Sequence, residues 1–415
     1  MSIMLRTILV CALGYFIDVF DINLFAVLRG PSLTQMGVTA DQLAVVGGNI
    51  LNAQMFGMIL GAFLWGWIGD RFGRLKAMYG SIIFYSIGTF ACAFVSDVIM
   101  YGWLRFLTGF GLAGETGAAI TLVAEIMSPA KRLWGITTVA GIGMLGPIAA
   151  IIIAWYTPWR STYMIAGALG IAILLLRLRL GESEMFRSLE HASVKRGSLS
   201  LFCRPEQLKT VAWCLLLGLP QTYFWFLLNF FSAELSKAVL QAGQVLNPKL
   251  VFLCFYSGTA CGDLMSGMTS QIWQSRRKTL AAFMAAGGAV SLAYLLIGSQ
   301  LKLSLPTFYF IYFVIGCSGG CWVLMTTLFA EHFGTNVRAT AAIVLTNLVR
   351  GLSIPLIFSF QALQQSMSIT SAAALIGIVS LIASLVALIR LRETHGTNLE
   401  YLETAKSLPT CPETV

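Results

Sequence analysis

Long apolar stretches separated by short polar ones run through the whole chain. An apolar helix needs about 20 residues to cross the hydrocarbon core of a bilayer. Twelve stretches reach or approach that length: 4–28, 43–69, 76–96, 99–127, 134–156, 161–180, 209–233, 250–273, 279–298, 306–333, 340–362 and 369–391. The pattern predicts an all-α membrane protein with twelve transmembrane helices and both chain ends on one side of the membrane.

A polar stretch over residues 181–208 separates six predicted spans from six. It predicts an N-terminal bundle over 1–180, a cytoplasmic linker over 181–208, a C-terminal bundle over 209–392 and a cytoplasmic tail over 393–415. The halves share short patterns, because Gly61-x4-Gly66 recurs as Gly262-x4-Gly267 and Glu125-x6-Arg132 recurs as Glu331-x6-Arg338. Repeated halves around a midplane site are typical of transporters, so we expect two pseudo-symmetric six-helix bundles.

The composition excludes a soluble domain and fixes the orientation. The chain is 57% hydrophobic and 11% charged, against about 25% charged residues in soluble domains. Its net charge of +9 lies mostly in the predicted loops on the side of the termini, whereas the opposite side holds only Arg29, Arg160, Lys237, Lys249 and Lys302. Cytoplasmic loops are the ones enriched in cations. We therefore expect a multi-pass protein of the inner (plasma) membrane with cytoplasmic termini, and no nucleic-acid partner.

Catalytic and metal-binding patterns are missing from the sequence. The nine cysteines lie singly, mostly inside apolar runs, and the three histidines lie in predicted loops or at helix ends. There is no HExxH, no CxxC pair and no nucleotide-binding Gly-x4-Gly-Lys-Ser/Thr. We therefore predict no enzymatic activity, no metal, no cofactor and no ATP-driven transport.

Several short motifs resemble those of one transporter family. The loop over 66–80, GWIGDRFGRLKAMYG, resembles the connection between the second and third helices of major facilitator superfamily transporters. The segments 105–115, 158–160, 330–340 and 393–396 resemble further motifs of its metabolite–proton symporter and sugar porter branches. The resemblance implies the major facilitator fold and alternating access powered by the proton gradient.

The resemblance also implies a cytoplasmic gate that latches when the transporter faces outward. Its residues in this chain are Asp70, Arg71, Arg74, Glu125, Arg132, Glu331 and Arg338. The alternative is that these charges only solvate helix ends. The second copy of the loop departs from the pattern, since Gln271 and Ser275 stand where the first copy has Asp70 and Arg74, which puts the gating role of that copy in doubt.

Four ionisable residues inside the first and fourth spans are candidates for proton coupling: Asp18, Asp21, Arg105 and Glu115. A charge at bilayer depth costs about 2.5–3.5 kcal/mol on insertion scales, so such residues are paired or face water. Asp21 lies roughly 25 Å into its span and Arg105 about 10 Å into an antiparallel one, which are compatible depths. In proton-coupled sugar porters, a first-helix aspartate pairs with this fourth-helix arginine.

Two interpretations of these charges stay open. The pair could be a proton switch or a static salt bridge, and depth favours Asp21 over Asp18 as the proton carrier. Glu115 is either a second titrating site or a packing group.

The second half supplies the candidates for substrate binding. Arg350 lies about 17 Å into the eleventh span, where its guanidinium could clamp a carboxylate or pair with Asp263. The further candidates offer polar tips on apolar helices: Asn347, Gln221, Tyr223, Trp225, Asn229 and Trp322. Pro220 is expected to break the seventh helix near the midplane.

Taken together, the sequence predicts a monomeric transporter for proton-coupled uptake of a small polar metabolite such as an organic acid, a sugar acid or an amino acid. The alternative is an exporter of a siderophore or drug-like compound by proton antiport. Gly146-Pro147 resembles the antiporter motif, but the glycines around it are missing. A transport-dead sensor is disfavoured, because only 23 residues follow Arg392.

Overall fold

The computed structural model describes residues 3–115, 141–178, 205–333 and 338–395, together with 119, 122, 123, 127, 138 and 139. The N-terminal half contains α1 (Ile3–Gln35), α2 (Leu43–Phe72), α3 (Arg74–Cys92), α4 (Val98–Leu112), α7 (Gly146–Tyr156) and α8 (Trp159–Arg177). The C-terminal half contains α11 (Pro205–Thr222), the π-helix η1 (Tyr223–Asn229), α12 (Ser232–Val239), α13 (Pro248–Ile272), α14 (Arg276–Leu296), α15 (Gly298–Leu301), α16 (Leu305–Gly319), α17 (Trp322–Glu331), α18 (Arg338–Gly351), α19 (Ser353–Leu363) and α20 (Ile369–Arg390).

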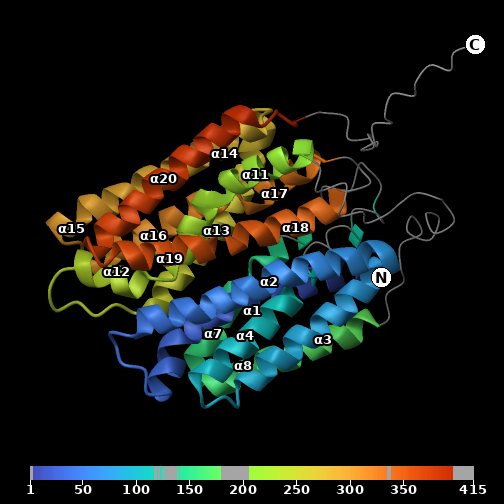
Figure 1. The fold of residues 1–415 in the computed structure, drawn as a ribbon, viewed down its shortest axis with the longest axis horizontal. Coiled ribbons are helices and arrows are strands. Elements are labelled where there is room, and N and C mark those ends of the chain that lie inside the picture. The colour runs from blue at the N-terminus through green and yellow to red at the C-terminus, as the bar shows by residue number, and fades with distance from the viewer. Residues whose placement is uncertain are drawn as a thin grey trace, which may run out of the picture.

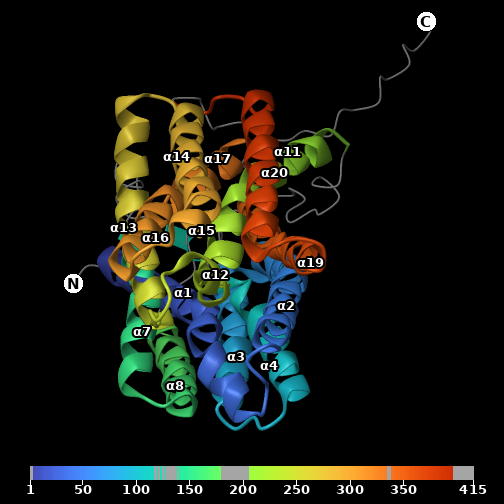
Figure 2. The same ribbon diagram turned by 90° about the vertical axis from the view of Figure 1, so that its left-hand side faces the viewer.

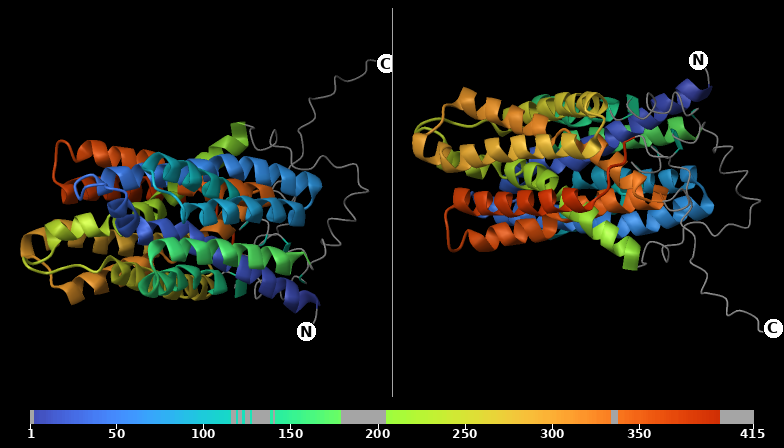
Figure 3. Two further views of the ribbon diagram at one scale, coloured as in Figure 1. Left: turned by 90° about the horizontal axis from the view of Figure 1, so that it is seen from below. Right: turned by 90° about the horizontal axis from the view of Figure 1, so that it is seen from above.

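The helices account for the predicted membrane spans. In the described part of the chain, nine helices are long and apolar enough to cross a membrane, and two shorter apolar helices cover Val98–Leu112 and Gly141–Tyr156. With α3, which has 19 residues, they match the twelve predicted spans in order. The helices run lengthwise from the end where α1 begins and α20 ends, the terminal face, to the end that holds α12 and α15, the far face (Figures 1 and 3).

The spans form two bundles that repeat one packing pattern. Helix α2 packs on α4 and α3 on α8, and in the second half α13 packs on α16 and α14 on α20. Figure 2 shows the first bundle below and the second above. They meet where α2 contacts α18 and α19, and where α7 contacts α13. This is the predicted two-bundle membrane fold; the domain boundaries at 180/181 and 208/209 stay predictions.

A pair of glycines explains why the two bundles share a sequence pattern. A Cβ at Gly61 would lie 2.2 Å from the carbonyl oxygen of Phe110 on α4, and a Cβ at Gly262 would lie 2.0 Å from that of Cys317 on α16. Both distances are far below a van der Waals contact, so only glycine permits this approach. The first glycine of the repeated pattern therefore sets an equivalent helix crossing in each half.

Several helices of the second bundle are irregular within the membrane. Helix α11 passes into the π-helix η1 shortly after Pro220, α16 and α17 are separated at Gly320 and Cys321, and α18 and α19 are separated at Leu352. Irregular backbone at this depth is tolerated where it is buried in protein or lines a cavity, and π-helical turns occur frequently at functional sites. The three breaks mark the interior of the second bundle as the place to look for a ligand site.

Candidate functional site

An ion pair between α1 and α4 occupies the core of the first bundle. The Arg105 Nη2 atom donates to Asp21 Oδ1 at 3.3 Å, and both residues are at most 1% exposed. The Thr89 hydroxyl on α3 donates to the other carboxylate oxygen of Asp21. The Arg105 guanidinium also lies 5.5 Å from the ring centroid of Tyr163 on α8. The structure thus brings together the two residues whose depths the sequence matched, while the proton role of Asp21 stays a prediction.

A second buried ion pair lies nearer the terminal face. Arg177, the last residue of α8, makes a two-pronged contact with Glu115, with Nη1 donating to Oε2 at 2.7 Å. Both residues are fully buried. Gly14 on α1 leaves the space that this pair fills, because a Cβ there would collide with both side chains. Arg177 lies inside the predicted span 161–180, and that position was the sequence signal for a buried, paired charge.

Asp18 lies between these two pairs along α1. It is fully buried, and it lies four residues from Gly14 and three from Asp21, so the three share one helix face. Asp18 interacts electrostatically with Tyr85 on α3 and with Tyr15 on its own helix. The first bundle therefore holds three carboxylates in successive layers, two of them paired with arginine.

A cluster of aromatic rings and one arginine lies in the second bundle. The rings of Trp225 and Trp322 lie 5.7 Å apart at 30°, and Tyr256 meets Trp225 edge-on at 6.2 Å. The Arg350 guanidinium lies 5.2 Å from the ring centroid of Trp322. Arg350 is 3% exposed, and no described carboxylate forms an ion pair with it. Asp263, its alternative partner, accepts instead from the backbone N–H of Val323 at 3.4 Å.

Among the remaining candidates for substrate binding, some side chains already form hydrogen bonds within the protein and others have polar atoms without a described partner. Gln221 donates to the carbonyl oxygen of Gly319, which holds η1 against the break between α16 and α17. Asn347 donates to Ile343 on its own helix and to the carbonyl oxygen of Ala113 in the other bundle. Tyr223 points towards Gly377 on α20. Among the described groups without a hydrogen-bond partner are Trp225 Nε1, Asn229 Oδ1 and Asn347 Oδ1, which are available to a ligand.

The two bundles are tied together at the far face. Arg29 on α1 forms an ion pair with Glu234 on α12 at 2.7 Å and lies 4.4 Å from the ring centroid of Phe230. Nearby, Tyr256 donates to Asn23, and Lys249 donates to the carbonyl oxygen of Ala154 at 2.5 Å. The first predicted span, 4–28, leaves Arg29 in the loop that follows it. That position is wrong, because α1 continues to Gln35.

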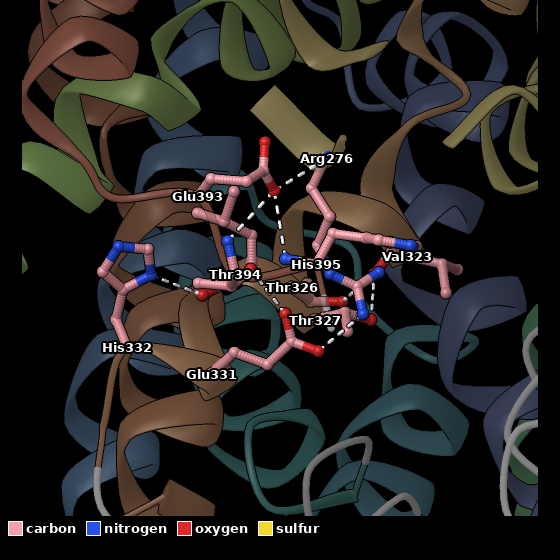
Figure 4. Close-up of polar contacts among 10 residues, drawn as sticks. Arg276, Val323, Thr326, Thr327, Glu331, His332, Glu393, Thr394 and His395 are labelled. Atoms are coloured by element: carbon pink, nitrogen blue, oxygen red, sulfur yellow. Dashed lines mark hydrogen bonds and ion pairs between the residues drawn. The ribbon is translucent and has the colours of Figure 1, made fainter. Parts of the chain in front are cut away.

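Polar contacts at the terminal face tie the segment after α20 to the second bundle (Figure 4). Glu331 accepts from Arg276 and from the Thr394 hydroxyl, both at 2.6 Å. The carboxylate of Glu393 accepts from the Ser275 hydroxyl at 2.5 Å and from the backbone N–H of Arg276 at 3.0 Å. Partial burial raises the pKa of Glu393, but these and further hydrogen bonds outweigh it and lower the pKa to about 2.

The structure describes only some of the residues of the predicted cytoplasmic gate. Glu331 is paired within its own bundle, and Arg71 is exposed beside Trp67, 5.3 Å from its ring centroid. Glu125 and Arg132 lie outside the described residues, as do the side chains of Asp70, Arg74 and Arg338. Ser275, the departure from the loop motif, caps α14 and binds Glu393. The gating role of all seven residues stays a prediction.

Membrane-crossing helices in two repeated bundles, with buried ion pairs and a polar interior, define a transporter and not an enzyme. The family model of the Major Facilitator Superfamily matches residues 11–358, and the chain belongs to that family.

Similar proteins are transporters. A Bacillus subtilis protein described as a niacin/nicotinamide transporter is 24% identical over 80% of this chain and 82% of its own length. The benzoate transport protein of Acinetobacter baylyi is 24% identical over 86% of each chain. The gentisate transporter of Corynebacterium glutamicum is 22% identical over 81% of this chain and 76% of its own.

Solved structures with this fold include a sugar symporter. The D-xylose–proton symporter has a TM-score of 0.70 at 14% identity and covers 96% of this chain and 100% of its own. An inward-open structure of the xylose transporter XylE from E. coli has a TM-score of 0.71 at 15% identity and covers 96% of this chain and 99% of its own. At that identity the likeness shows the fold alone.

Proposed function

We propose that this protein is a proton-coupled importer of a small organic acid, and that the preferred substrates are aromatic monocarboxylates. It works by alternating access, as a monomer, with the proton gradient as its energy source and no cofactor. The coarser prediction, a transporter of the major facilitator superfamily, is confirmed by the family match.

One observation carries the choice of substrate: Arg350 is buried, forms no ion pair with a described carboxylate, and lies against the pair of Trp225 and Trp322. A charged group at this depth is stable when an opposite charge or water compensates it. A substrate carboxylate supplies that charge to Arg350 in bidentate form. An aromatic ring beside Trp225 and Trp322 gains from offset or edge-on packing. The names of relatives that carry niacin, benzoate and gentisate agree with this chemistry.

The orientation of the protein in the membrane follows from the distribution of its Lys and Arg residues. If the terminal face is cytoplasmic, as the positive-inside rule indicates, the far face is the outer one. The contacts of Arg29 with Glu234 and Phe230 then close the outer entrance, and the structure represents a state in which the substrate path is shut from outside. The predicted gate residues at the cytoplasmic face act in the opposite state.

The proton is carried by Asp21. Its carboxylate accepts hydrogen bonds from Arg105 and Thr89 in the present state, and each of these contacts stabilises the charged form. When substrate binding draws Arg105 away, Asp21 in a dry bundle core gains a proton. The two events load substrate and proton together, which is symport and not antiport.

Substitution of Arg350 tests this function. In proteoliposomes, Arg350→Lys should weaken benzoate or nicotinate affinity by about tenfold or more, because an ammonium group cannot form the bidentate fork. The methyl esters of both acids should bind the wild type poorly, and should lose little further affinity in the variant.

The controls separate binding from folding and import from export. Lys278→Arg, at the exposed start of α14, should leave affinity unchanged. Esters that bind the wild type as well as the acids do would rule out a carboxylate clamp. Benzoate efflux driven by an inward proton gradient would establish antiport and export instead.

A further inference from the structure

Tyr256 on α13 contacts both the aromatic cluster of the second bundle and the first bundle. Its ring meets that of Trp225 edge-on, with the ring centroids 6.2 Å apart. Its hydroxyl donates to the side chain of Asn23 on α1, and both hydrogen-bonded residues are at most 5% exposed. A single side chain therefore joins the proposed site of the substrate ring to the other bundle.

Asn23 is oriented for this contact by its own helix. Its Nδ2 atom donates to the carbonyl oxygen of Val19, one turn earlier on α1, at 2.7 Å. A carbonyl oxygen only accepts hydrogen bonds, so the amide nitrogen of Asn23 faces Val19 and its Oδ1 atom is left to face Tyr256. A phenol O–H can donate to that oxygen, whereas a phenylalanine at position 256 has nothing to donate. The contact between the bundles thus depends on the tyrosine hydroxyl.

The Tyr256–Asn23 contact lies deeper than the other contacts that join the bundles at the far face. On α13, Lys249, which donates across to the first bundle, lies seven positions before Tyr256, or about 10 Å along the helix axis. On α1, Arg29, which pairs with the second bundle, lies six positions after Asn23, or about 9 Å. The two helices agree on the depth, which places the contact beneath the far face.

The aromatic cluster connects Tyr256 to Arg350. The rings of Trp225 and Trp322 lie 5.7 Å apart, and the Arg350 guanidinium lies 5.2 Å from the ring centroid of Trp322. In the proposed function, the substrate carboxylate binds Arg350 and the substrate ring packs on this tryptophan pair. A carboxylate without a ring, such as acetate, reaches Arg350 alone. Contact between the substrate and Trp225 therefore requires a ring.

We propose that Tyr256 makes closure of the far face depend on an aromatic ring in the substrate, an inference that rests on the proposed function and deepens it. A bound ring packs on Trp225 and keeps it in edge-on contact with Tyr256, whose hydroxyl then binds Asn23 and holds the bundles together. By linkage, the factor by which the ring stabilises the Tyr256–Asn23 contact equals the factor by which that contact strengthens binding of the ring. Tyr256 is a positioning residue, because it acts on the substrate through Trp225.

Such a contact adds selectivity at the step of closure. Acetate neutralises Arg350 but makes no contact with Trp225, so it does not stabilise the closed far face through Tyr256. One hydrogen bond changes an equilibrium by about fivefold. Since a loaded carrier must close on the outside before it opens on the inside, this factor multiplies the selectivity of the binding site itself.

The test measures how benzoate changes access from the far face. The probe is Ile357→Cys on α19, a buried position 3.3 Å from where a Cβ at Gly48 on α2 would lie, labelled in a cysteine-free background with a membrane-impermeant reagent. Saturating benzoate should slow labelling by about fivefold or more, and saturating acetate by less than about twofold. In Tyr256→Phe the benzoate effect should fall below about twofold, while benzoate affinity weakens by no more than about fivefold.

Two control variants distinguish a response to the ring from a fixed contact between the bundles. Tyr294→Phe removes the hydroxyl of a buried tyrosine that contacts Tyr312 within the second bundle, and it should keep the wild-type benzoate effect. Glu234→Gln loosens the far face at its contact with Arg29, so it should speed labelling by the same factor with and without benzoate. If Tyr256→Phe also speeds labelling equally in both conditions, Tyr256 is a fixed contact and the proposal is wrong.

The outcomes also separate this proposal from the proposed function. If benzoate and acetate slow labelling of the wild type equally, closure does not respond to a ring; the proposal is then wrong and the proposed function stands. If the wild type binds no benzoate, the proposed function is wrong and the proposal falls with it.

A second variant covers the case in which Tyr256→Phe does not fold. Asn23→Ala removes the acceptor from the other side of the contact and should cause the same loss of the benzoate effect. Where both single variants fold, the double variant should lose no more than either, because both remove one hydrogen bond. A wild-type benzoate effect in folded Asn23→Ala would overturn the proposal.

Discussion

Three helices meet at the carboxylate of Asp21: α1 carries it, and α4 and α3 supply its hydrogen-bond donors. Arg105 from α4 and Thr89 from α3 both donate to it, and each contact stabilises the charged form. Removing one member of a buried pair leaves an uncompensated charge, which costs about 3–5 kcal/mol. Loss of a partner of Asp21 is therefore more costly than loss of a partner of a surface aspartate.

We expect Asp21→Asn to abolish proton-driven accumulation and to leave energy-independent exchange largely intact. Asparagine keeps the shape and part of the hydrogen bonding, but it carries no proton. The measurement is benzoate uptake into substrate-loaded proteoliposomes with and without an imposed pH gradient. Asp18→Asn in parallel decides between the carboxylates. Accumulation that persists in Asp21→Asn and disappears in Asp18→Asn would transfer the role to Asp18.

Helix crossings in both bundles depend on glycines that leave room for a backbone carbonyl of the neighbouring helix. At Gly61 the approach comes from Phe110, and the equivalent crossing is made at Gly262. Neither glycine needs an unusual backbone conformation, so the requirement is for space alone.

We expect Gly61→Ala to destabilise the protein by about 1–3 kcal/mol, because the added methyl group forces α2 and α4 apart. Gly102→Ala on α4 is the matched control, since a Cβ there meets nothing within 4 Å. That change should be neutral or should stabilise by up to about 1 kcal/mol through helix propensity. Thermal unfolding in detergent measures both. Equal melting temperatures for the two variants would show that the crossing relaxes easily.

The whole molecule is held in its present state by contacts across the far face. Arg29 and Glu234 are 205 positions apart and join the two bundles. Their side chains are 8% and 17% exposed, so the pair is only weakly screened by solvent. At the terminal face, by contrast, Glu331 is paired within its own bundle. The described contacts therefore bind the two bundles to each other at the far face.

We expect Glu234→Gln to shift the population towards the state open at the far face. A loss of about 1 kcal/mol changes the ratio of states about fivefold. The readout is labelling of Ile357→Cys, a buried position that faces Gly48 between the bundles, in a cysteine-free background with a membrane-impermeant reagent. Lys237→Gln, on the same helix α12, is the control and should leave labelling unchanged. The reversed pair Arg29→Glu with Glu234→Arg should restore slow labelling, and failure to do so would assign the effect to folding.

The sequence by itself determined the spans, the two halves and the main buried charges. A bilayer demands about 20 apolar residues per helix and penalises every charge within it, so both appear directly in the order of residues. Depth alone matched Asp21 with Arg105. The repeated glycines likewise indicated two equivalent halves.

Only the tertiary structure decided which side chains meet. Glu115 binds Arg177, and Arg29 binds Glu234 although Arg29 lies where the sequence suggested a loop. Thr89 donates to Asp21, and Trp322 lies beneath Arg350. These contacts join helices far apart in the chain, and they depend on the rotation of each helix about its axis and on how far it continues beyond its apolar stretch. Local hydrophobicity predicts neither the rotation of a helix nor where it ends. A face that contacts lipid and a face that contacts the protein interior are equally apolar.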